Sequence, residues 1–417
     1  MATPEPNASG PRTHGPVFGI QIPAGFDFNP RTRLVFGENS IDSLGELVKE
    51  FGGKRVLVVT DGGIVRAGHA DRARSVISKS GPSVFLYDKV CENPTTHDVS
   101  ECVAFAKTHD IDFIVGLGGG SSMDTAKGAN FIYSNGGKMA DYWGVNKAKK
   151  PMLPLIAVPT TAGTGSECQA FALIADEKTH LKMACGDEKA YARAAILDPR
   201  LTLSMPRGVT ANTGVDTIVH ALESHVCNVR NPISQLFSCE AWRLAENSLE
   251  VVLREPGNVE ARGKMLLASA YAGIAIAQSM LGIAHSAANP LSAHYRVIHG
   301  QAVGIMLPHV VRFNSADTVA LKLYAELAAA AGLARAGDDP QSGLTALLKR
   351  VNALLASAQI PASLEAAGVS REGLDVMSVD ASKQWTVNFN PRKAGVEDFR
   401  ALYSAAFDPR PAVSAGR

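Results

Sequence analysis

Short runs of consecutive apolar residues recur through the first half of the chain and alternate with helical patterns. The runs lie at 55–61, 83–87, 113–117, 155–161 and 194–197, and helical spacing occurs between them, for example at 41–51 and 99–109. A strand that is apolar at every position, rather than at every second one, is typical of a sheet covered on both faces. Because such strands alternate with helices, the first half predicts a mostly parallel sheet.

The pattern changes near Pro206. Long stretches rich in alanine and leucine follow at 210–226, 233–253, 265–280, 318–331 and 344–358, and their apolar residues recur with helical spacing. The sequence therefore predicts an α/β domain at 21–206 and an all-helical domain at 207–417. Residues 1–20 are rich in Pro, Gly, Asn and Thr, and we expect them to form a flexible tail.

Composition predicts a large core and excludes some partners. Of the 417 residues, 46% are hydrophobic and 19% are charged, which fits about two to three folded domains. The formal net charge of +1 gives no electrostatic basis for binding nucleic acid or an anionic membrane. Residues 265–284 carry no charge and are long enough to cross a bilayer, but they are rich in alanine, and we expect a buried helix instead.

The cysteines and the N-terminus indicate a cytoplasmic protein. The cysteines at 91, 102, 168, 185, 227 and 239 form no Cys-x-x-Cys pair, and their spacing shows no disulfide or zinc-ribbon framework. Residues 1–19 contain no apolar core segment and little positive charge, so we expect no secretory signal. Reduced thiols in the cytoplasm are the resulting expectation.

A glycine-rich turn follows the apolar run at 113–117. It reads Gly118, Gly119, Gly120, Ser121 and Ser122, and a helical pattern begins there. Glycines let the backbone approach an anion, and free amides at a helix start point toward it, so the turn is a candidate phosphate site. The spacing is not Gly-x-Gly-x-x-Gly and includes no Walker lysine, so an ordinary strand-to-helix turn is the alternative.

A second segment supports the nucleotide hypothesis. Residues 159–167 read Pro-Thr-Thr-Ala-Gly-Thr-Gly-Ser-Glu and again follow an apolar run. Two such segments on successive strand ends predict a shared crevice at the carboxyl edge of a sheet. Asp61 also closes a strand, where it could accept the ribose hydroxyls of NAD and repel the 2′-phosphate of NADP. Because Asp-Gly is a common turn pair, a solvated turn aspartate is the alternative.

Imidazoles and one carboxylate gather in the helical half. Asp216 and His220 are four residues apart in a helical pattern, so both side chains leave the same face. Three of the 11 histidines, His285, His294 and His299, fall within 15 residues beside an apolar helix that His285 is expected to end. One carboxylate and three imidazoles suit Fe(II), Zn(II) or a similar ion, although an isolated Asp-x-x-x-His pair more often forms a surface hydrogen bond. A phosphate cradle with a metal site suggests a redox enzyme that uses a dinucleotide.

Several longer motifs resemble a known family. They are Gly-Gly-Gly-Ser-Ser-Met-Asp-Thr-Ala-Lys at 118–127, the segment at 159–167, Asp-Thr-Ile-Val-His-Ala-Leu-Glu at 216–223, the run at 285–300, Leu-Pro-His at 307–309 and Asn-Pro-Arg at 390–392. From residue 28 to residue 407 the chain resembles the iron-containing (group III) alcohol dehydrogenases. The resemblance implies an N-terminal NAD-binding α/β domain and a helical, metal-binding C-terminal domain, with the metal in the cleft between them.

The resemblance also implies roles for single residues. The metal ligands that it implies are Asp216, His220, His285 and His299. The cofactor contacts that it implies are Asp61, Asn93, Pro94, Gly118, Gly119, Gly120, Ser121, Asp124, Thr160, Thr161 and Ser166. Fe(II) is the metal that the family implies, and Zn(II) fits the same donors. A homodimer or larger homo-oligomer is expected because family members often assemble in this way.

One position departs from the family pattern. The family usually shows His-x-x-x-His-Pro, with the second histidine near the nicotinamide and the substrate, whereas this chain has Asn289 at that position. Asparagine can hydrogen-bond a substrate oxygen but cannot titrate. The candidate catalytic residues are therefore Asn289 itself and His294, which with Tyr295 is the nearest titrating group in the sequence.

The expected reaction is reversible hydride transfer between a small alcohol or aldehyde and NAD(H), with the metal as Lewis acid on the substrate oxygen. The alternative is an NAD- and metal-dependent carbon–oxygen lyase or cyclase of the dehydroquinate synthase type, in which NAD is reduced only transiently. A third alternative, an inactive nucleotide-binding scaffold, is disfavoured because all four ligand positions are filled. Net NADH formed with a simple alcohol would identify the dehydrogenase.

Overall fold

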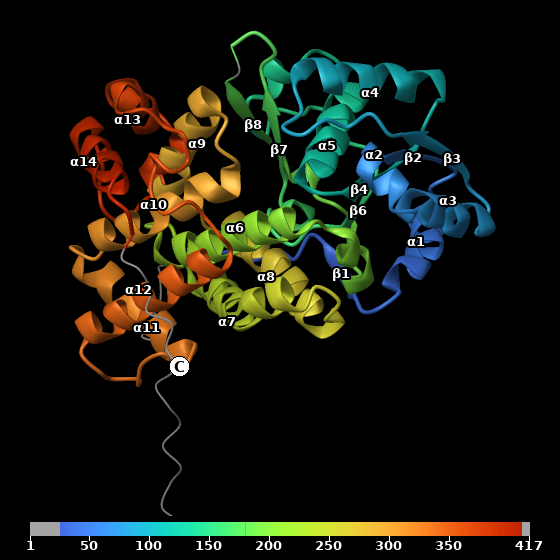
Figure 1. The fold of residues 1–417 in the computed structure, drawn as a ribbon. Helices are drawn as coiled ribbons and strands as arrows, with labels where there is room; N and C mark the ends of the chain where they lie inside the picture. Colours follow the sequence, from blue (N-terminus) through green and yellow to red (C-terminus); the bar gives the residue numbers. More distant parts are fainter. Residues whose placement is uncertain (1–25, 180, 411–417) are drawn as a thin grey trace, which may run out of the picture.

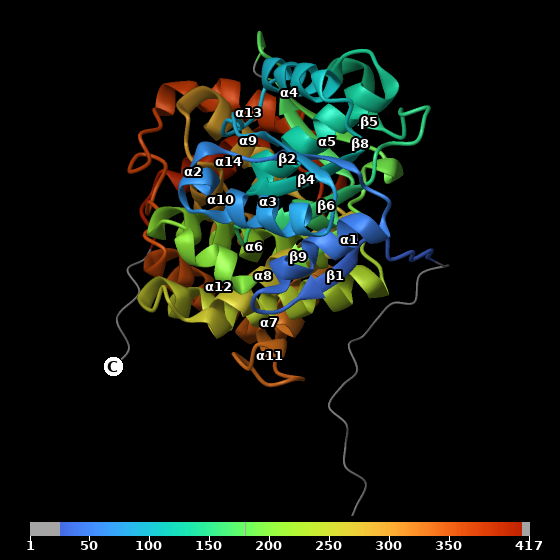
Figure 2. The same ribbon diagram turned by 90° about the vertical axis from the view of Figure 1, so that its right-hand side faces the viewer.

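The computed structural model describes residues 26–179 and 181–410. A sheet-containing half, coloured blue to green, lies beside a helical half, coloured green to red (Figures 1 and 2). The described residues after 206 form helices and no strands. The predicted fold class, a mostly parallel α/β half followed by an all-helical half, is therefore confirmed.

Parallel strands form the main sheet of the described chain. In spatial order they are β1 (Arg33–Phe36), β9 (Ala194–Leu197), β6 (Leu155–Pro159), β4 (Phe113–Gly118), β2 (Arg55–Val59) and β3 (Ser83–Tyr87). Each neighbouring pair is parallel. The register sets Gly118 beside Pro159, so β4 and β6 end together. Their carboxyl ends bring the two predicted nucleotide segments to one edge of the sheet.

Helices cover both faces of this sheet. The helices are α1 (Leu44–Glu50) and α3 (His69–Lys79) on one face, and α4 (Thr96–Thr108) and α5 (Gly120–Asn135) on the other. Along β2, Val56 and Val58 pack with the first pair of helices, while Leu57 and Val59 pack with the second. Burial on both sides explains why this strand is apolar at every position.

The residues after β2 differ from the expected turn. Gly62 and Gly63 begin a short helix, α2 (Gly62–Arg66), because the Asp61 side chain accepts hydrogen bonds from the amides of Gly63 and Ile64. Those amides would otherwise lack partners at the start of a helix. The Asp-Gly pair is thus the beginning of a capped helix.

A second sheet has no counterpart among the expected elements. It consists of β5 (Gly144–Val145), β8 (Lys182–Gly186) and β7 (Phe171–Ala175), and β7 and β8 are antiparallel. One face of this hairpin is partly exposed, so its strands lack the continuous apolar runs that indicate buried strands. The hairpin projects beside the helical half (Figure 1).

The helical half begins after the 3-10 turn η5 (Pro199–Ser204). Its helices are α6 (Arg207–Val226), α7 (Pro232–Arg254), α8 (Val259–Ala277), α9 (Ile283–Tyr295), α10 (His299–Asn314), α11 (Thr318–Ala330), α12 (Pro340–Ser357), α13 (Leu374–Ser382) and α14 (Val396–Ala406). The longest of them pack as α6, α7 and α8 against one another. No helix of the described residues is long and apolar enough to cross a membrane. The exact division into domains at residue 206 stays a prediction.

One expectation about the helices is wrong. The helix that covers the apolar stretch ends at Ala277, and His285 lies in the first turn of the next helix, α9. The break at Gly282 is stabilised because the amides of Ile283 and Ala284 find side-chain acceptors, Asn390 and Glu223. His285 therefore starts a helix rather than ending one.

Candidate active site

The glycine turn forms the N-terminus of α5 and exposes backbone amides there. Gly119 is the N-cap of this helix and supplies no side-chain cap. Gly118 has φ +145°, a conformation that favours glycine, and a Cβ there would collide with Ser122. Free amides at the start of a 16-residue helix suit an anion such as a dinucleotide phosphate.

The loop after β6 packs against this glycine turn. The Thr160 amide donates to the Gly118 carbonyl at 2.9 Å. A Cβ on Gly119 would lie 3.2 Å from Thr161, and a Cβ on Gly120 would lie 2.7 Å from Thr164. Because a Cβ at these positions would crowd the threonines, the glycines let the two segments pack closely at this edge of the sheet.

Asp61 lies near the glycine turn, at the end of β2. Its Oδ1 caps α2, while its Oδ2 would lie 3.5 Å from a Cβ on Gly118. Asp61 is therefore a helix cap and also a neighbour of the glycine turn. On the opposite side the Asn93 amide donates to Ser121 Oγ at 3.2 Å, and the Pro94 carbonyl accepts from the Ala175 amide of β7.

A buried lysine, which sequence reasoning assigned no role, anchors the loop after β6. Lys127 Nζ donates to the Ser166 carbonyl, to Ser166 Oγ and to the carbonyls of Gln169 and Phe171 at 2.5–3.1 Å. Ser166 Oγ in turn donates to Asp124 at 3.1 Å. Burial lowers the pKa of Lys127 to about 8, against the opposing effect of Asp124, and burial raises the pKa of Asp124.

Four side chains converge within the helical half. Asp216 and His220 leave the same face of α6, His285 comes from α9, and His299 begins α10. The Nε2 atoms of His220, His285 and His299 lie 3.4, 3.5 and 3.6 Å from Asp216 Oδ1. Asp216, His220 and His285 form a buried cluster whose ligand atoms all lie within 4.8 Å of one another. His299 is the more open member, with 34% of its side chain exposed.

This geometry fits a metal ion. Two ligands about 2.1 Å from a tetrahedral ion are about 3.4 Å apart, close to the spacing observed. Asp216 Oδ1 and His285 Nε2 are buried and have no hydrogen-bond partner in the described chain. Such atoms are costly to bury unless something satisfies them. A divalent cation at the point where they converge would satisfy both.

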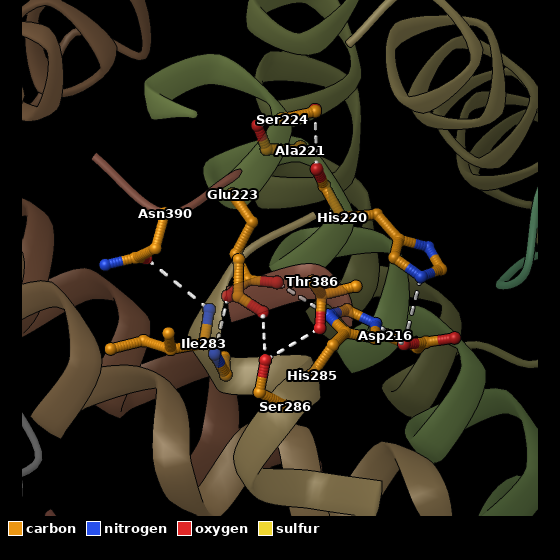
Figure 3. Close-up of polar contacts among 12 residues, drawn as sticks. Asp216, His220, Ala221, Glu223, Ser224, Ile283, His285, Ser286, Thr386 and Asn390 are labelled. Carbon is orange, nitrogen blue, oxygen red and sulfur yellow. Dashed lines mark hydrogen bonds and ion pairs between the residues drawn. The ribbon is translucent and has the colours of Figure 1, made fainter. Parts of the chain in front are cut away.

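The ring nitrogens that face away from this point are held by acceptors. His285 Nδ1 and the Ala284 amide each lie 2.6 Å from an oxygen of Glu223 (Figure 3). His220 Nδ1 lies 3.1 Å from the Gly163 carbonyl. With a proton on Nδ1, each ring directs the lone pair of Nε2 toward Asp216. The sequence analysis assigned Glu223 no role. Its position three residues after His220 and seven after Asp216 places it on the same face of the helix, and that spacing could have identified it.

The electrostatics of the cluster keep Asp216 ionised. Burial raises its pKa, but the surrounding imidazoles outweigh burial and hold the pKa well below its usual range. Burial lowers the pKa of His220. Burial also acts to lower the pKa of His285, yet the neighbouring carboxylates of Asp216 and Glu223 raise it to about 9. The site therefore attracts positive charge, as a cation site does.

The structure separates the two candidate catalytic residues. Asn289 lies one turn after His285 on α9, and its Nδ2 donates to Gln384 Oε1 at 2.9 Å. His294 Nε2 lies 2.8 Å from Asp380 with 40% of its side chain exposed. Nine residues of helix separate His294 from His285, roughly 13 Å along the axis. The structure thus brings Asn289, but not His294, close to the cluster.

Fold and site together define a dinucleotide- and metal-binding α/β protein with a helical second half. Family models agree: residues 30–199 match "Iron-containing alcohol dehydrogenase" and residues 210–407 match "Fe-containing alcohol dehydrogenase family, C-terminal". The chain therefore belongs to the iron-containing alcohol dehydrogenase family, and the protein is an oxidoreductase of that family.

Individual relatives show the same likeness over most of the chain. It is 33% identical to alcohol dehydrogenase 4 of Schizosaccharomyces pombe, covering 94% of this chain and 89% of that protein. It is 32% identical to an NAD-dependent methanol dehydrogenase of Bacillus methanolicus, covering 89% and 97%. Among solved structures, a 1,3-propanediol oxidoreductase superposes with TM-score 0.89 at 30% identity, covering 92% and 100%.

Proposed function

We propose that this protein is a metal-dependent alcohol dehydrogenase that catalyses reversible hydride transfer between a small alcohol or aldehyde and NAD(H). The observation that supports it best is the convergence of three Nε2 atoms on Asp216 Oδ1 at 3.4–3.6 Å. A metal there supplies Lewis-acid polarisation of the substrate oxygen, and the dinucleotide supplies the hydride acceptor or donor. Fe(II) is our first choice from the family, and Zn(II) suits the same donors.

The chain's own residues bind and orient these groups. Asp216, His220, His285 and His299 hold the ion, while Glu223 and the Gly163 carbonyl fix the ring orientation of two of the ligands. The amides of the 118–120 turn, with Ser121, Thr160, Thr161 and Ser166 nearby, hold the dinucleotide. The proposal also includes Asn93, Pro94 and Asp124 among the cofactor contacts. Asp61 selects NAD over NADP because a 2′-phosphate beside a carboxylate meets a like charge.

The proton released from the alcohol needs a path that does not use residue 289. The Asn289 amide cannot titrate, and its donor group is engaged by Gln384. His294 is paired with Asp380 at the far end of α9. We therefore propose that the alcohol proton passes to solvent water at the partly exposed His299.

Metal and turnover should be lost together in a ligand variant. We expect His285→Ala to abolish both bound metal and NADH formation with simple alcohols, whereas His97→Ala, at an exposed histidine of α4, should leave both unchanged. Metal analysis and NADH absorbance, on protein reloaded with Fe(II) or Zn(II), measure the two effects. Full activity of His285→Ala after chelator treatment would contradict the assignment. Transient reduction of NAD without net NADH would indicate the lyase instead.

Assembly and location are part of the proposal. We infer a homodimer or larger homo-oligomer from the family, which size-exclusion chromatography with light scattering would test. All six cysteines are free thiols in the structure, five of them buried. Free thiols are compatible with the proposed cytoplasmic location.

A further inference from the structure

The segment Gln384–Thr386 is attached to α9 at two points beside the metal cluster. Asn289 Nδ2 donates to Gln384 Oε1 at 2.9 Å. The hydroxyls of Ser286 and Thr386 lie 2.7 Å apart (Figure 3). Ser286 directly follows the metal-binding candidate His285. The segment is therefore fixed against the helix that carries His285.

Trp385 lies between these two attachments and reaches the other half of the molecule. Its ring centroid is 5.8 Å from that of Phe171 on β7, and Phe389 packs edge-on against it at 5.5 Å. Trp385 begins the 3-10 turn η7 (Trp385–Phe389) and remains 40% exposed. An exposed aromatic ring beside a metal cluster is surface that a ligand can cover.

Phe171 is held from the cofactor side. Lys127, which anchors Ser166 in the crevice, also donates to the Phe171 carbonyl at 3.1 Å. Along β7, Phe171 and Leu173 share the partly exposed face, while Ala172 and Ile174 are buried on the other. The charged side chain on this face is Lys182, which pairs with Ala175 at the opposite end of the hairpin register from Phe171 and whose charge acts on Asp124 and His299.

We propose that Trp385 and Phe171 form the wall against which the carbon chain of the substrate packs, so that the enzyme prefers alcohols and aldehydes with an uncharged apolar chain or ring. This inference rests on the proposed dehydrogenase function. Asn289 then acts as a positioning residue: its amide holds Gln384 and thereby Trp385. Its replacement of the family's usual histidine is explained by this hydrogen bond rather than by proton transfer.

A series of substrates tests the proposal on the metal-loaded wild-type enzyme. We expect kcat/KM to rise about fourfold per added methylene from ethanol to 1-pentanol, the factor for burying one CH₂ group. Benzyl alcohol should rank with the longest alcohols. Glycerol, 1,3-propanediol and glycolate, which carry hydroxyls or a charge in place of apolar groups, should rank lowest.

Variants locate the effect. Trp385→Ala and Phe171→Ala should each reduce the increase per methylene to less than twofold while metal content stays unchanged. The double variant should lose little more, because the two rings form one surface. Trp385→Phe should retain most of the slope. Leu236→Ala, at a leucine of α7 that is 62% exposed, is the matched control and should keep the wild-type slope.

The outcomes separate the two proposals. If no alcohol yields NADH with metal-loaded enzyme, the dehydrogenase function itself fails. If alcohols are oxidised without a rise along the series, or if glycolate is preferred through Lys182, the dehydrogenase stands and the aromatic wall is refuted. An unchanged slope in both alanine variants would also refute it. The wild-type series gives this answer even where a variant does not fold.

Discussion

Replacement of Glu223 by glutamine should weaken metal binding without removing a ligand. In the native structure, one carboxylate oxygen accepts from the Ala284 amide and the other from His285 Nδ1, both at 2.6 Å. Glutamine has one acceptor oxygen and one NH₂ donor. In Glu223→Gln, either the start of α9 or the His285 ring must therefore face a donor instead of an acceptor.

The expected magnitude follows from this loss. A hydrogen bond to a charged group contributes about 1.5–3 kcal/mol. Loss of the acceptor behind a metal-binding histidine typically lowers metal affinity by about 10- to 100-fold, which corresponds to about 1.4–2.8 kcal/mol. Because the two free energies agree, we expect the metal dissociation constant of Glu223→Gln to be about 10- to 100-fold higher than that of wild type.

Competition with a chelator of known affinity measures this constant, and activity at saturating metal measures what remains. We expect activity to recover largely when metal is in excess, because the four ligands are intact. Glu246→Gln is the matched control: this glutamate is equally buried but pairs with Arg350 on the outer side of α7. The control should lower stability and leave metal affinity unchanged.

A metal dissociation constant within twofold of wild type would refute the reasoning. It would show that the contacts of Glu223 serve only the start of α9, and that the orientation of His285 does not depend on this carboxylate. Equal loss of metal affinity in the Glu246→Gln control would refute it as well, since the effect would then be general destabilisation.

Three further predictions concern the cofactor crevice and α9. Asp61→Gly should improve use of NADP relative to NAD, measured as the ratio of kcat/KM values; a wild-type enzyme that prefers NADP would overturn this prediction. Asn289→His should shift the pH dependence of turnover or the ranking of substrates, and unchanged profile and ranking would mean that the substitution is tolerated without consequence. The pKa of Lys127 is about 8 in the folded protein and about 10.5 in the unfolded chain. Between these pH values Lys127 is protonated in the unfolded chain but not in the folded protein, so raising the pH favours folding. The free energy of unfolding of wild type relative to Lys127→Met should therefore rise from pH 8 to 10.5 in chemical denaturation, and a flat difference would contradict a pKa lowered by burial.

The sequence predicted the parts of the site that depend on local pattern. The apolar runs located β2, β4 and β6, and the glycine turn that follows β4 lies where the register of parallel strands requires. Asp216 and His220 share a face because four residues make about one turn of helix. Their meeting with His285 and His299 followed only from the resemblance, since no local pattern brings α6, α9 and α10 together.

The contacts that were missed all depend on packing between distant segments. Glu223 meets His285 from a position 62 residues earlier, and Trp385 meets Phe171 across the two halves. Lys127 looks like a solvent-exposed helix residue in the sequence, yet it is fully buried by loop carbonyls. His294 was favoured by proximity in sequence, but a rigid helix carries it away from the cluster.

The segment from the end of β6 through η3 (Ser166–Cys168) contacts residues of both proposed binding sites. Its Gly163 carbonyl orients His220, its Ser166 meets Asp124, and the Gly165 amide bonds Ser269 on α8. When one loop serves two ligands, occupancy of one site changes the free energy of occupying the other, and thermodynamic linkage makes that factor equal in both directions. Saturating nucleotide would thus change the metal affinity of the enzyme by the same factor by which bound metal changes its nucleotide affinity.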